Sequence, residues 1–340
     1  MAFRTVISFT SFVSYLLIQS CVMTGEKPVI YSVAGKESPS EKEIWLTHEH
    51  LLVDFIGADS ISFDRWDKEA VISVMKPYLE EIADHDVQYF VDATPAYLGR
   101  DAELLKELSE QAGVKILSNT GFYGARQNKF IPQFAFDLSS GELAEIWIGE
   151  FEDGIDNTSI KPGFIKIAVD VADPLDPMQQ KLVEAAAIAH LETGLTIGSH
   201  TGKALALWPQ LKILKENGVS PEAFIWIHAD NEKDYSNYIK AAEEGCWISF
   251  DKFAWNLDAP LDRLIFAKEN GILDKILISH DAGWYDPAKE EQNPRGFTAI
   301  FEKVIPELKA NGFTGEDLDL LLKVNPVKAF GIKKRAFSEK

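Results

Sequence analysis

Eight short apolar segments alternate with amphipathic stretches along the chain, and this alternation limits the fold more than any other feature of the sequence. The short segments have the length of buried strands, and the stretches between them repeat apolar residues at helical spacing. The expected strands span residues 44–52, 87–94, 115–122, 164–170, 195–201, 223–230, 247–253 and 275–281. The expected helices include residues 101–112, 177–193, 204–217, 234–244 and 261–270. Eight strand–helix units predict an α/β fold, a (β/α)8 TIM barrel.

An open, doubly wound sheet is the alternative that the same alternation allows. Such a sheet often carries a glycine-rich phosphate loop after its first strand, and the sequence has no loop of this kind there. A chain of 340 residues can form one large domain or two small ones. We expect a single barrel domain over residues 44–333.

The first 43 residues precede the first expected barrel strand. Residues 1–20 contain an early Arg4 and then a short apolar stretch, which is typical of a signal peptide and too short to cross a membrane as a helix. The sequence Leu-Ile-Gln-Ser-Cys that ends at Cys21 resembles the lipobox of bacterial lipoproteins, in which the cysteine is acylated. An ordinary secretory cleavage beside a chance cysteine is the alternative.

We therefore expect a lipoprotein signal peptide at residues 1–20 and a flexible tether at residues 21–43. The protein would then be exported and held on the periplasmic or cell-surface side of a bacterial membrane, through a lipid on Cys21. Its net charge of -19 argues against a nucleic-acid partner, because phosphate backbones require clustered lysine and arginine. The expected partner is a small-molecule substrate.

The expected strand at residues 44–52 contains His48 and His50. Successive side chains of a strand point to opposite faces, so these two imidazoles share one face and Glu49 points to the other. Two imidazoles side by side on a rigid strand can bind a first-row metal, with zinc as the default. For this motif alone, two core histidines without a metal are the alternative.

Polar side chains recur near the carboxyl ends of later expected strands. The chemistry of a barrel is found at that end, where different strands each contribute one or two groups. Buried charges and imidazoles are costly unless they are paired or bind a metal, so packing alone does not explain the set. The candidate metal ligands are His48, His50, Lys166, His200, His228 and Asp281.

This set and its surrounding motifs resemble the phosphotriesterase-like branch of the amidohydrolase superfamily, from about residue 44 to about residue 331. The motifs are His-Glu-His at 48–50, Thr-Gly-Phe-Tyr at 120–123, Lys-Pro-Gly-Phe-Ile-Lys-Ile-Ala at 161–168, Gly-Ser-His-Thr-Gly at 198–202, Ile-His-Ala-Asp at 227–230, Ser-His-Asp at 279–281 and Asn-Pro-Val-Lys-Ala-Phe at 325–330. The resemblance implies a binuclear centre of two divalent metal ions, with zinc expected and manganese or cobalt as alternatives. A homodimer would also fit it.

By the same resemblance, one metal would be bound by His48, His50 and Asp281, and the other by His200 and His228. Lys166 would be carboxylated by CO2, so that its carbamate bridges both metals. Two such metals lower the pKa of a shared water and polarise a carbonyl or phosphoryl oxygen. Asp281 is the candidate that accepts the proton and passes it to the leaving group.

Two positions depart from the phosphotriesterases proper. Asn231 stands where those enzymes have an aspartate of the proton relay, and Lys252 stands where they have a histidine. Lactonase relatives often have a cationic arginine at the second position, which favours a lactone or carboxylic ester as the substrate. Lys252 would hold the carbonyl oxygen or an anionic group of that substrate; a solvated lysine at the strand end is the alternative.

Two other functions compete with a lactone or ester hydrolase. One is a hydrolase of phosphotriesters or phosphodiesters, and the other is a surface lipoprotein that binds a ligand without turning it over. The second requires a broken metal site, although all six ligand positions hold suitable residues. Substrate choice depends on the loops after the last two expected strands, which contain Trp255, Trp284, Tyr285 and Arg295. These aromatic residues suggest an apolar wall, or they simply pack.

Overall fold

Parallel strands that alternate with helices form the protein. The computed structural model describes residues 27–338, apart from the side chains at positions 258 and 259. The parallel strands are β3 (Ile44–Leu52), β4 (Val87–Asp92), β5 (Lys115–Leu117), β6 (Asn119–Thr120), β7 (Phe164–Ala168), β8 (Ile197–His200), β9 (Phe224–Ile227), β10 (Trp247–Phe250), β11 (Ile276–Ile278) and β12 (Gly283–Tyr285). Their hydrogen-bonded orders are β11-β10-β9-β8-β7-β6 and β12-β3-β4-β5.

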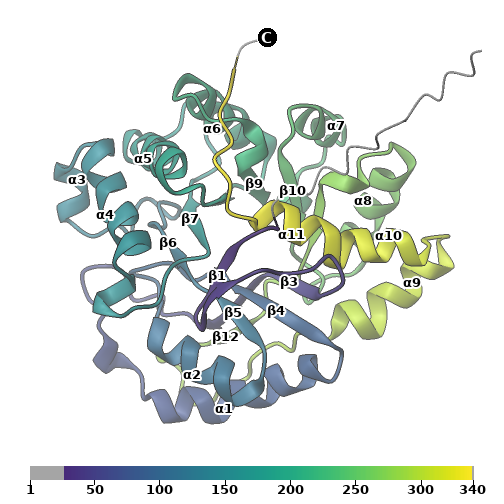
Figure 1. The fold of residues 1–340 in the computed structure, drawn as a ribbon, viewed down its shortest axis with the longest axis horizontal. Coiled ribbons are helices and arrows are strands. Elements are labelled where there is room, and N and C mark those ends of the chain that lie inside the picture. The colour runs from purple at the N-terminus through teal and green to yellow at the C-terminus, as the bar shows by residue number, and fades with distance from the viewer. Residues whose placement is uncertain (1–26, 339–340) are drawn as a thin grey trace, which may run out of the picture.

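Two junctions join these runs into a barrel. At the first, the chain passes directly from β5 to β6 through Ser118, so the expected strand at residues 115–122 is present in two parts. At the second, β11 lies beside β3, where the backbone N–H of Asp281 donates to the carbonyl of His48 at 3.2 Å. Figure 1 looks along this barrel, with the helices in a ring around the strands. The predicted α/β barrel is confirmed.

The helices cover the outside of the strands. They are α1 (Lys68–Ala83), α2 (Ala102–Ala112), α3 (Phe134–Asp137), α4 (Ser140–Glu152), α5 (Pro177–Thr193), α6 (Ala204–Glu216), α7 (Ser236–Glu243), α8 (Asp258–Glu269), α9 (Ile305–Ala310), α10 (Gly315–Asp319) and α11 (Asn325–Phe330). The sequence prediction omitted α1, which contains Pro77, and α4, although the capping box of Ser139 and Glu142 marks the start of α4. Within residues 27–338, no helix combines the length and the apolar composition that a membrane span requires.

Aromatic side chains fill the barrel at the amino ends of its strands. Trp45 of β3 stacks on Tyr89 of β4 with ring centroids 4.2 Å apart, and Phe330 of α11 stacks on Trp45 at 6.0 Å. All three side chains are buried. Because apolar packing closes this end, polar side chains can be accommodated at the opposite end without opening the core.

The expected flexible tether is wrong for residues 30–37, which form a hairpin of β1 (Ile30–Ser32) and β2 (Gly35–Glu37). Ile30 is fully buried in the same cluster as Phe330, and the backbone N–H of Val33 donates to Ile116 at 2.8 Å. In Figure 1, β1 and α11 cross the end of the barrel that faces the viewer. The hairpin folds because its apolar residues cover this end. The proposed signal peptide and Cys21 lie outside the described residues.

Candidate metal centre

The six predicted metal ligands converge on one pocket at the carboxyl ends of the barrel strands. Its lining consists of His48, His50, Val53, Phe55, Leu98, Tyr123, Arg126, Lys166, His200, His228, Asp281 and Trp284. The ring centroids of His48 and His228 are 5.0 Å apart, and those of His200 and His228 are 4.4 Å apart. The cavity has a volume of about 70 Å³. One water molecule needs about 10–15 Å³ of such space, so the cavity holds several water molecules or the reacting group of a substrate.

His48 and His50 lie on one face of β3, as their spacing predicts, and Asp281 approaches both of them. One carboxylate oxygen, Oδ1, lies 3.2 Å from Nε2 of His50 and 3.6 Å from Nε2 of His48. The backbone of Asp281 has φ of 51° and that of His228 has φ of 60°. Left-handed backbone is uncommon outside glycine, although aspartate and histidine adopt it more often than most residues, and it is concentrated at functional sites.

The imidazoles are held in the neutral form that binds metals. Burial lowers the pKa values of His48, His200 and His228 well below the usual range, and the positive charge of Lys166 lowers them further. In the described part of the chain, Nδ1 of His48 and Nδ1 of His228 are buried without a hydrogen-bond partner. Buried nitrogens of this kind are costly. Donor atoms of His48, His228 and Asp281 all lie within 4.8 Å of one another, so the residues fit a metal centre.

Lys166 lies among these groups on β7, with 1% of its surface exposed. Burial lowers its pKa to about 8, partly offset by the charges of Asp281 and Asp251. Among the described residues, no carboxylate lies within ion-pair distance of Nζ; instead, the Tyr123 ring lies 5.5 Å away. A Cβ at Gly121 would collide with the carbonyl of Lys166, so only glycine lets the chain pass this close to β7.

Glu49, between the two histidines, fixes the segment that carries Asp281. Its buried carboxylate accepts hydrogen bonds from the Ser279 hydroxyl at 2.7 Å and from the backbone N–H groups of His280 at 2.9 Å and Ala282 at 3.0 Å. It also lies 2.7 Å from Nδ1 of His280. Because these bonds flank Asp281 on both sides, Glu49 holds its left-handed backbone in place. The sequence indicated only that Glu49 points away from the histidine face.

Further groups orient the imidazoles. Nδ1 of His50 lies 2.7 Å from the Thr94 hydroxyl, which leaves Nε2 free to point at Asp281. A carboxylate oxygen of Asp251 accepts the backbone N–H of His228 at 2.7 Å; it also lies 3.4 Å from Nδ1 of the same residue without forming a hydrogen bond to it. A hydrogen-bond partner such as Thr94 fixes the ring orientation of a metal-binding histidine.

The sequence analysis did not identify Asp230 and Asp251 as site residues. Both are buried beside His228, and donor atoms of the three lie within 4.8 Å of one another. Burial raises the pKa of Asp251 well above its usual range and that of Asp230 to about 6. Among the described residues, neither carboxylate oxygen of Asp230 has a hydrogen-bond partner. Only their sequence positions, near His228 and Lys252, could have indicated a role.

Lys252 lies next to the site rather than in it. Its ammonium group donates a hydrogen bond to the side-chain oxygen of Asn231, so the two departures from the phosphotriesterase pattern contact each other. Lys252 is not part of the described lining of the metal pocket, although its charge lowers the pKa values of His200 and His228.

Aromatic side chains from the last loops form one wall of the mouth of the pocket. Trp284 meets His50 edge to face at 5.7 Å and packs against Trp255 at 5.5 Å. Nε1 of Trp255 donates to the carbonyl of Asp281 at 2.8 Å, and the guanidinium of Arg295 lies 3.7 Å from the Trp255 ring centroid. Tyr285 of β12 pairs with Leu52 of the neighbouring strand β3.

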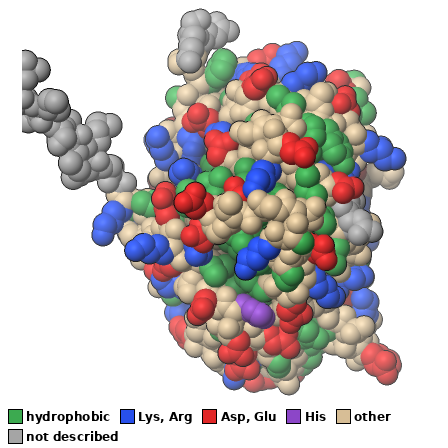
Figure 2. Space-filling view, turned by 90° about the vertical axis from the view of Figure 1, so that its right-hand side faces the viewer, with side chains coloured by type: hydrophobic (Ala, Val, Ile, Leu, Met, Phe, Trp, Pro, Cys, Tyr) green, Lys and Arg blue, Asp and Glu red, His purple; other side chains and the backbone are tan. Residues whose placement is uncertain are grey.

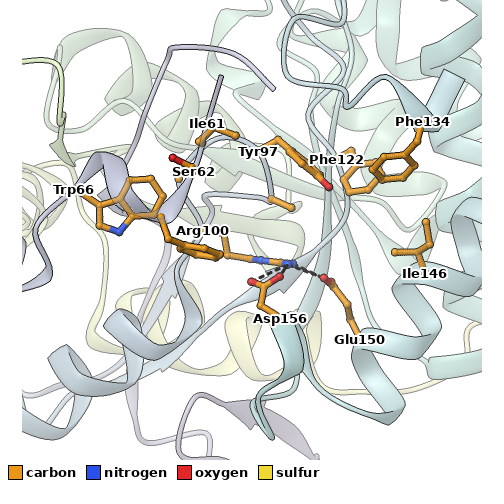
Figure 3. Close-up of a pocket in the computed structure, with 13 residues that line it drawn as sticks. Ile61, Ser62, Trp66, Tyr97, Arg100, Phe122, Phe134, Ile146, Glu150 and Asp156 are labelled. Carbon is orange, nitrogen blue, oxygen red and sulfur yellow. Dashed lines mark hydrogen bonds and ion pairs between the residues drawn. The ribbon is translucent and has the colours of Figure 1, made fainter. Parts of the chain in front are cut away.

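A larger hollow of about 220 Å³ lies beside the metal pocket and is shown in Figure 3. Its walls include the rings of Trp66, Tyr97, Phe122 and Phe134. The guanidinium of Arg100 donates to Glu150 at 2.6 Å and 2.9 Å and to Asp156 at 3.2 Å. Because these charged groups neutralise one another, we assign the chemistry to the smaller pocket, where the polar groups lack partners.

Comparisons with known proteins identify the family of the chain. The model of the Phosphotriesterase family matches residues 29–330. The phosphotriesterase homology protein of Escherichia coli strain K12 is 28% identical over 289 residues, which covers 84% of this chain and 97% of that protein. Aryldialkylphosphatase of Saccharolobus solfataricus is 31% identical over 322 residues, with 88% and 98% covered. Human N-acetyltaurine hydrolase is 27% identical over 341 residues, with 87% and 96% covered. The chain therefore belongs to the phosphotriesterase family of metal-dependent hydrolases.

Proposed function

We propose that this hydrolase acts on lactones or carboxylic esters with a binuclear centre of divalent metals, zinc first and manganese or cobalt as alternatives. The observation that carries the proposal is the convergence of four imidazoles, Asp281 and Lys166 on one small pocket. His48, His50 and Asp281 would hold one metal, and His200 and His228 the other. When bound, the metals lower the pKa of a water molecule and polarise the substrate carbonyl.

Lys166 would bridge the two metals as a carbamate. The contacts of the residue support this role, because the buried amine has a lowered pKa of about 8 and no ion-pair partner in the described range. A neutral amine is the form that reacts with CO2, and the carbamate would add a second anion to the site beside Asp281.

The other steps belong to side chains of the protein. Asp281 accepts the proton of the attacking water and delivers it to the leaving alkoxide. Glu49 holds Asp281 in position through the two flanking N–H groups. Trp284 and Trp255 cover the mouth and restrict the access of bulk water.

The substrate class follows from Lys252 and Asn231. Their hydrogen bond stands in place of the histidine–aspartate relay of phosphotriesterases and sets a cation beside the metal pocket, where Lys252 would hold an oxygen on the part of the substrate that extends past the lining. Hydrolysis of a phosphoester is the second candidate, because a relative that is 31% identical is an aryldialkylphosphatase. The relative named N-acetyltaurine hydrolase adds an amide to the bonds that deserve a test.

A substrate panel tests this proposal. Protein loaded separately with zinc, manganese and cobalt is assayed on lactones, aryl and alkyl esters, a phosphotriester, a phosphodiester and N-acyl amides. We expect the highest kcat/KM for a lactone or ester and about two metals per chain by elemental analysis. A clear preference for the phosphotriester or the amide would replace the proposed substrate class. Folded protein that binds no stoichiometric metal would instead favour a non-catalytic binding protein.

We propose that the partner of the protein is a small molecule. We also propose that the protein forms a homodimer and is anchored to a membrane. Figure 2 shows acidic and basic side chains interspersed over the face it draws, rather than the basic patch that nucleic acids require.

We propose that the protein is exported and anchored through an acylated Cys21. Changing Cys21→Ala should release the protein from the membrane fraction; persistence in that fraction would contradict the anchor. Sedimentation equilibrium of the released protein would test the dimer.

A further inference from the structure

Arg126 occupies the mouth of the metal pocket without a role in the proposed chemistry. It lines the pocket together with the predicted ligands, and its guanidinium lies 4.7 Å from the centroid of the Phe55 ring. Among the described residues, no carboxylate lies within ion-pair distance of this guanidinium, although the chain has a net charge of -19. Stacking on an aromatic face leaves the N–H groups of an arginine free to bind an anion in bidentate fashion.

The loop that carries Arg126 is fixed by the protein. Arg126, Gln127 and Asn128 all have left-handed backbone, with φ of 60°, 59° and 61°. The carboxylate of Asp170 accepts the backbone N–H of Arg126 at 2.8 Å and that of Gln127 at 3.0 Å. The buried side chain of Gln179 donates to Asp170 at 2.9 Å. Such a loop places the guanidinium before a ligand arrives, which reduces the cost of binding.

Positive charge gathers around this pocket in an otherwise acidic protein. Lys166 and Arg126 line the pocket, and Lys252 lies next to it on Asn231. In the described lining, Asp281 is the one carboxylate, and it is a predicted metal ligand. Arg126 and Trp284 line the same cavity of about 70 Å³ as the predicted ligands, so a substrate whose reacting group meets the ligands also lies near Arg126 and Trp284.

We infer that Arg126 binds an anionic group, a carboxylate or sulfonate, on the part of the substrate remote from the scissile bond. The inference rests on the proposed hydrolase function and narrows its substrate class to esters and lactones that carry a negative charge. The apolar stem of such a substrate lies against Phe55 and Trp284, whose rings are 5.6 Å apart. Arg126 is therefore a specificity-determining residue that does not contact the reacting atoms.

Two substrates that differ by one charge test the inference. The first is the 4-nitrophenyl monoester of adipic acid, with a free carboxylate, and the second is its methyl ester, with that carboxylate blocked. Wild type should prefer the first in kcat/KM. Arg126→Gln should remove about 10- to 100-fold of this preference, the contribution of a charged hydrogen-bonded pair, while kcat/KM for the blocked substrate is unchanged. Arg126→Lys should retain part of it.

Lys203→Gln is the matched control, because this exposed lysine precedes α6 on the same rim but outside the lining of the pocket. It should leave the preference intact. Equal losses on both substrates in Arg126→Gln would assign Arg126 a structural role, and an unchanged preference would assign the anion to the metals; either result overturns the inference.

A binding experiment separates the inference from the proposed function. Metal-loaded wild type and Arg126→Gln are titrated by calorimetry with two ketones that contain no hydrolysable ester: 6-oxoheptanoate, which has one carboxylate, and heptan-2-one, which has none. Tighter binding of 6-oxoheptanoate that disappears in the variant supports the inference even if neither aryl ester is hydrolysed, in which case the proposed function fails alone. Equal affinities of the two ligands for wild type would overturn the anion subsite.

Discussion

Two buried cationic side chains, Arg100 and Lys166, have opposite surroundings in this molecule. Burial disfavours the charge on both. Around Arg100, Glu150 and Asp156 compensate for burial and raise the pKa above its ordinary value. Around Lys166, no described carboxylate is close enough to form an ion pair, and the pKa falls to about 8. A buried cation that the protein neutralises supports the fold, whereas one left without a counter-ion marks where an external group completes a site.

The largest expected effect comes from Lys166→Ala. Both proposed metal positions share this residue, so the variant should lose bound metal and hydrolase activity together, roughly 10³-fold or more in kcat/KM. The barrel should still fold, because apolar packing dominates its core. Elemental analysis measures the bound metal, steady-state kinetics measure kcat/KM, and circular dichroism measures whether the barrel is folded. Short carboxylates added to the variant should partly restore metal and turnover, since they can replace the bridge; full activity without them would refute the assignment.

Arg100→Met should show the converse pattern. Removing the cation leaves Glu150 and Asp156 facing each other, with side chains that are 17% and 36% exposed. We expect the free energy of unfolding to fall by about 2–3 kcal/mol, less than for a fully buried pair because Asp156 is partly solvated. Metal content and kcat/KM should stay near wild type. Urea unfolding and elemental analysis check both; loss of metal in Arg100→Met would erase the distinction between the two cations.

Glu49→Gln tests the support of Asp281 rather than a metal ligand. In wild type, the Glu49 carboxylate accepts hydrogen bonds from Ser279 and from the backbone N–H groups of His280 and Ala282. In the variant, one of its oxygens becomes an N–H₂ group that cannot accept, so the segment around Asp281 loses at least one hydrogen bond. Metal affinity should fall about 10- to 100-fold, as for other residues that orient a ligand. Competition with a chelator measures this change. The exposed Glu41→Gln is the control and should have no effect. An unaltered metal affinity in Glu49→Gln would show that Asp281 needs no such support.

The smallest effect is expected at His190, a buried titratable side chain of α5 that lies outside the described lining of the metal pocket. Its Nε2 accepts the backbone N–H of Arg335 at 2.9 Å, and burial lowers its pKa below the usual 6.5. The unfolded state therefore binds more protons below pH 6.5, and the free energy of unfolding should decrease as the pH falls through that range. His190→Gln should flatten this slope in urea titrations from pH 7.5 to 5.5. An identical slope would exclude His190 as its source.

Local patterns in the sequence determined the scaffold and the ligand set. The bounds of β3 at residues 44–52 and of α5 at residues 177–193 agree with the predicted ranges, because apolar periodicity acts over a few neighbouring residues. The six ligand candidates share a pocket because each lies on, or shortly after, a strand of the same barrel. α2 and α5 end at glycines, Gly113 and Gly194, both with positive φ, and glycine is the usual residue at this position.

Contacts between distant segments decided the rest. The sequence places Glu49 only on one face of a strand, whereas its role depends on hydrogen bonds that Ser279 and Ala282, more than 200 positions away, donate to it. The sequence predicted a tether over residues 30–37, but these residues form a hairpin because Ile30 packs in the buried cluster that contains Phe330. Nothing in the sequence distinguishes Arg126 from other exposed arginines, and only the barrel places it in the lining of the metal pocket, where no described carboxylate pairs with it. Periodicity and motifs encode how a segment folds locally, but burial, charge pairing and access to a cavity depend on which segments the closed barrel brings together.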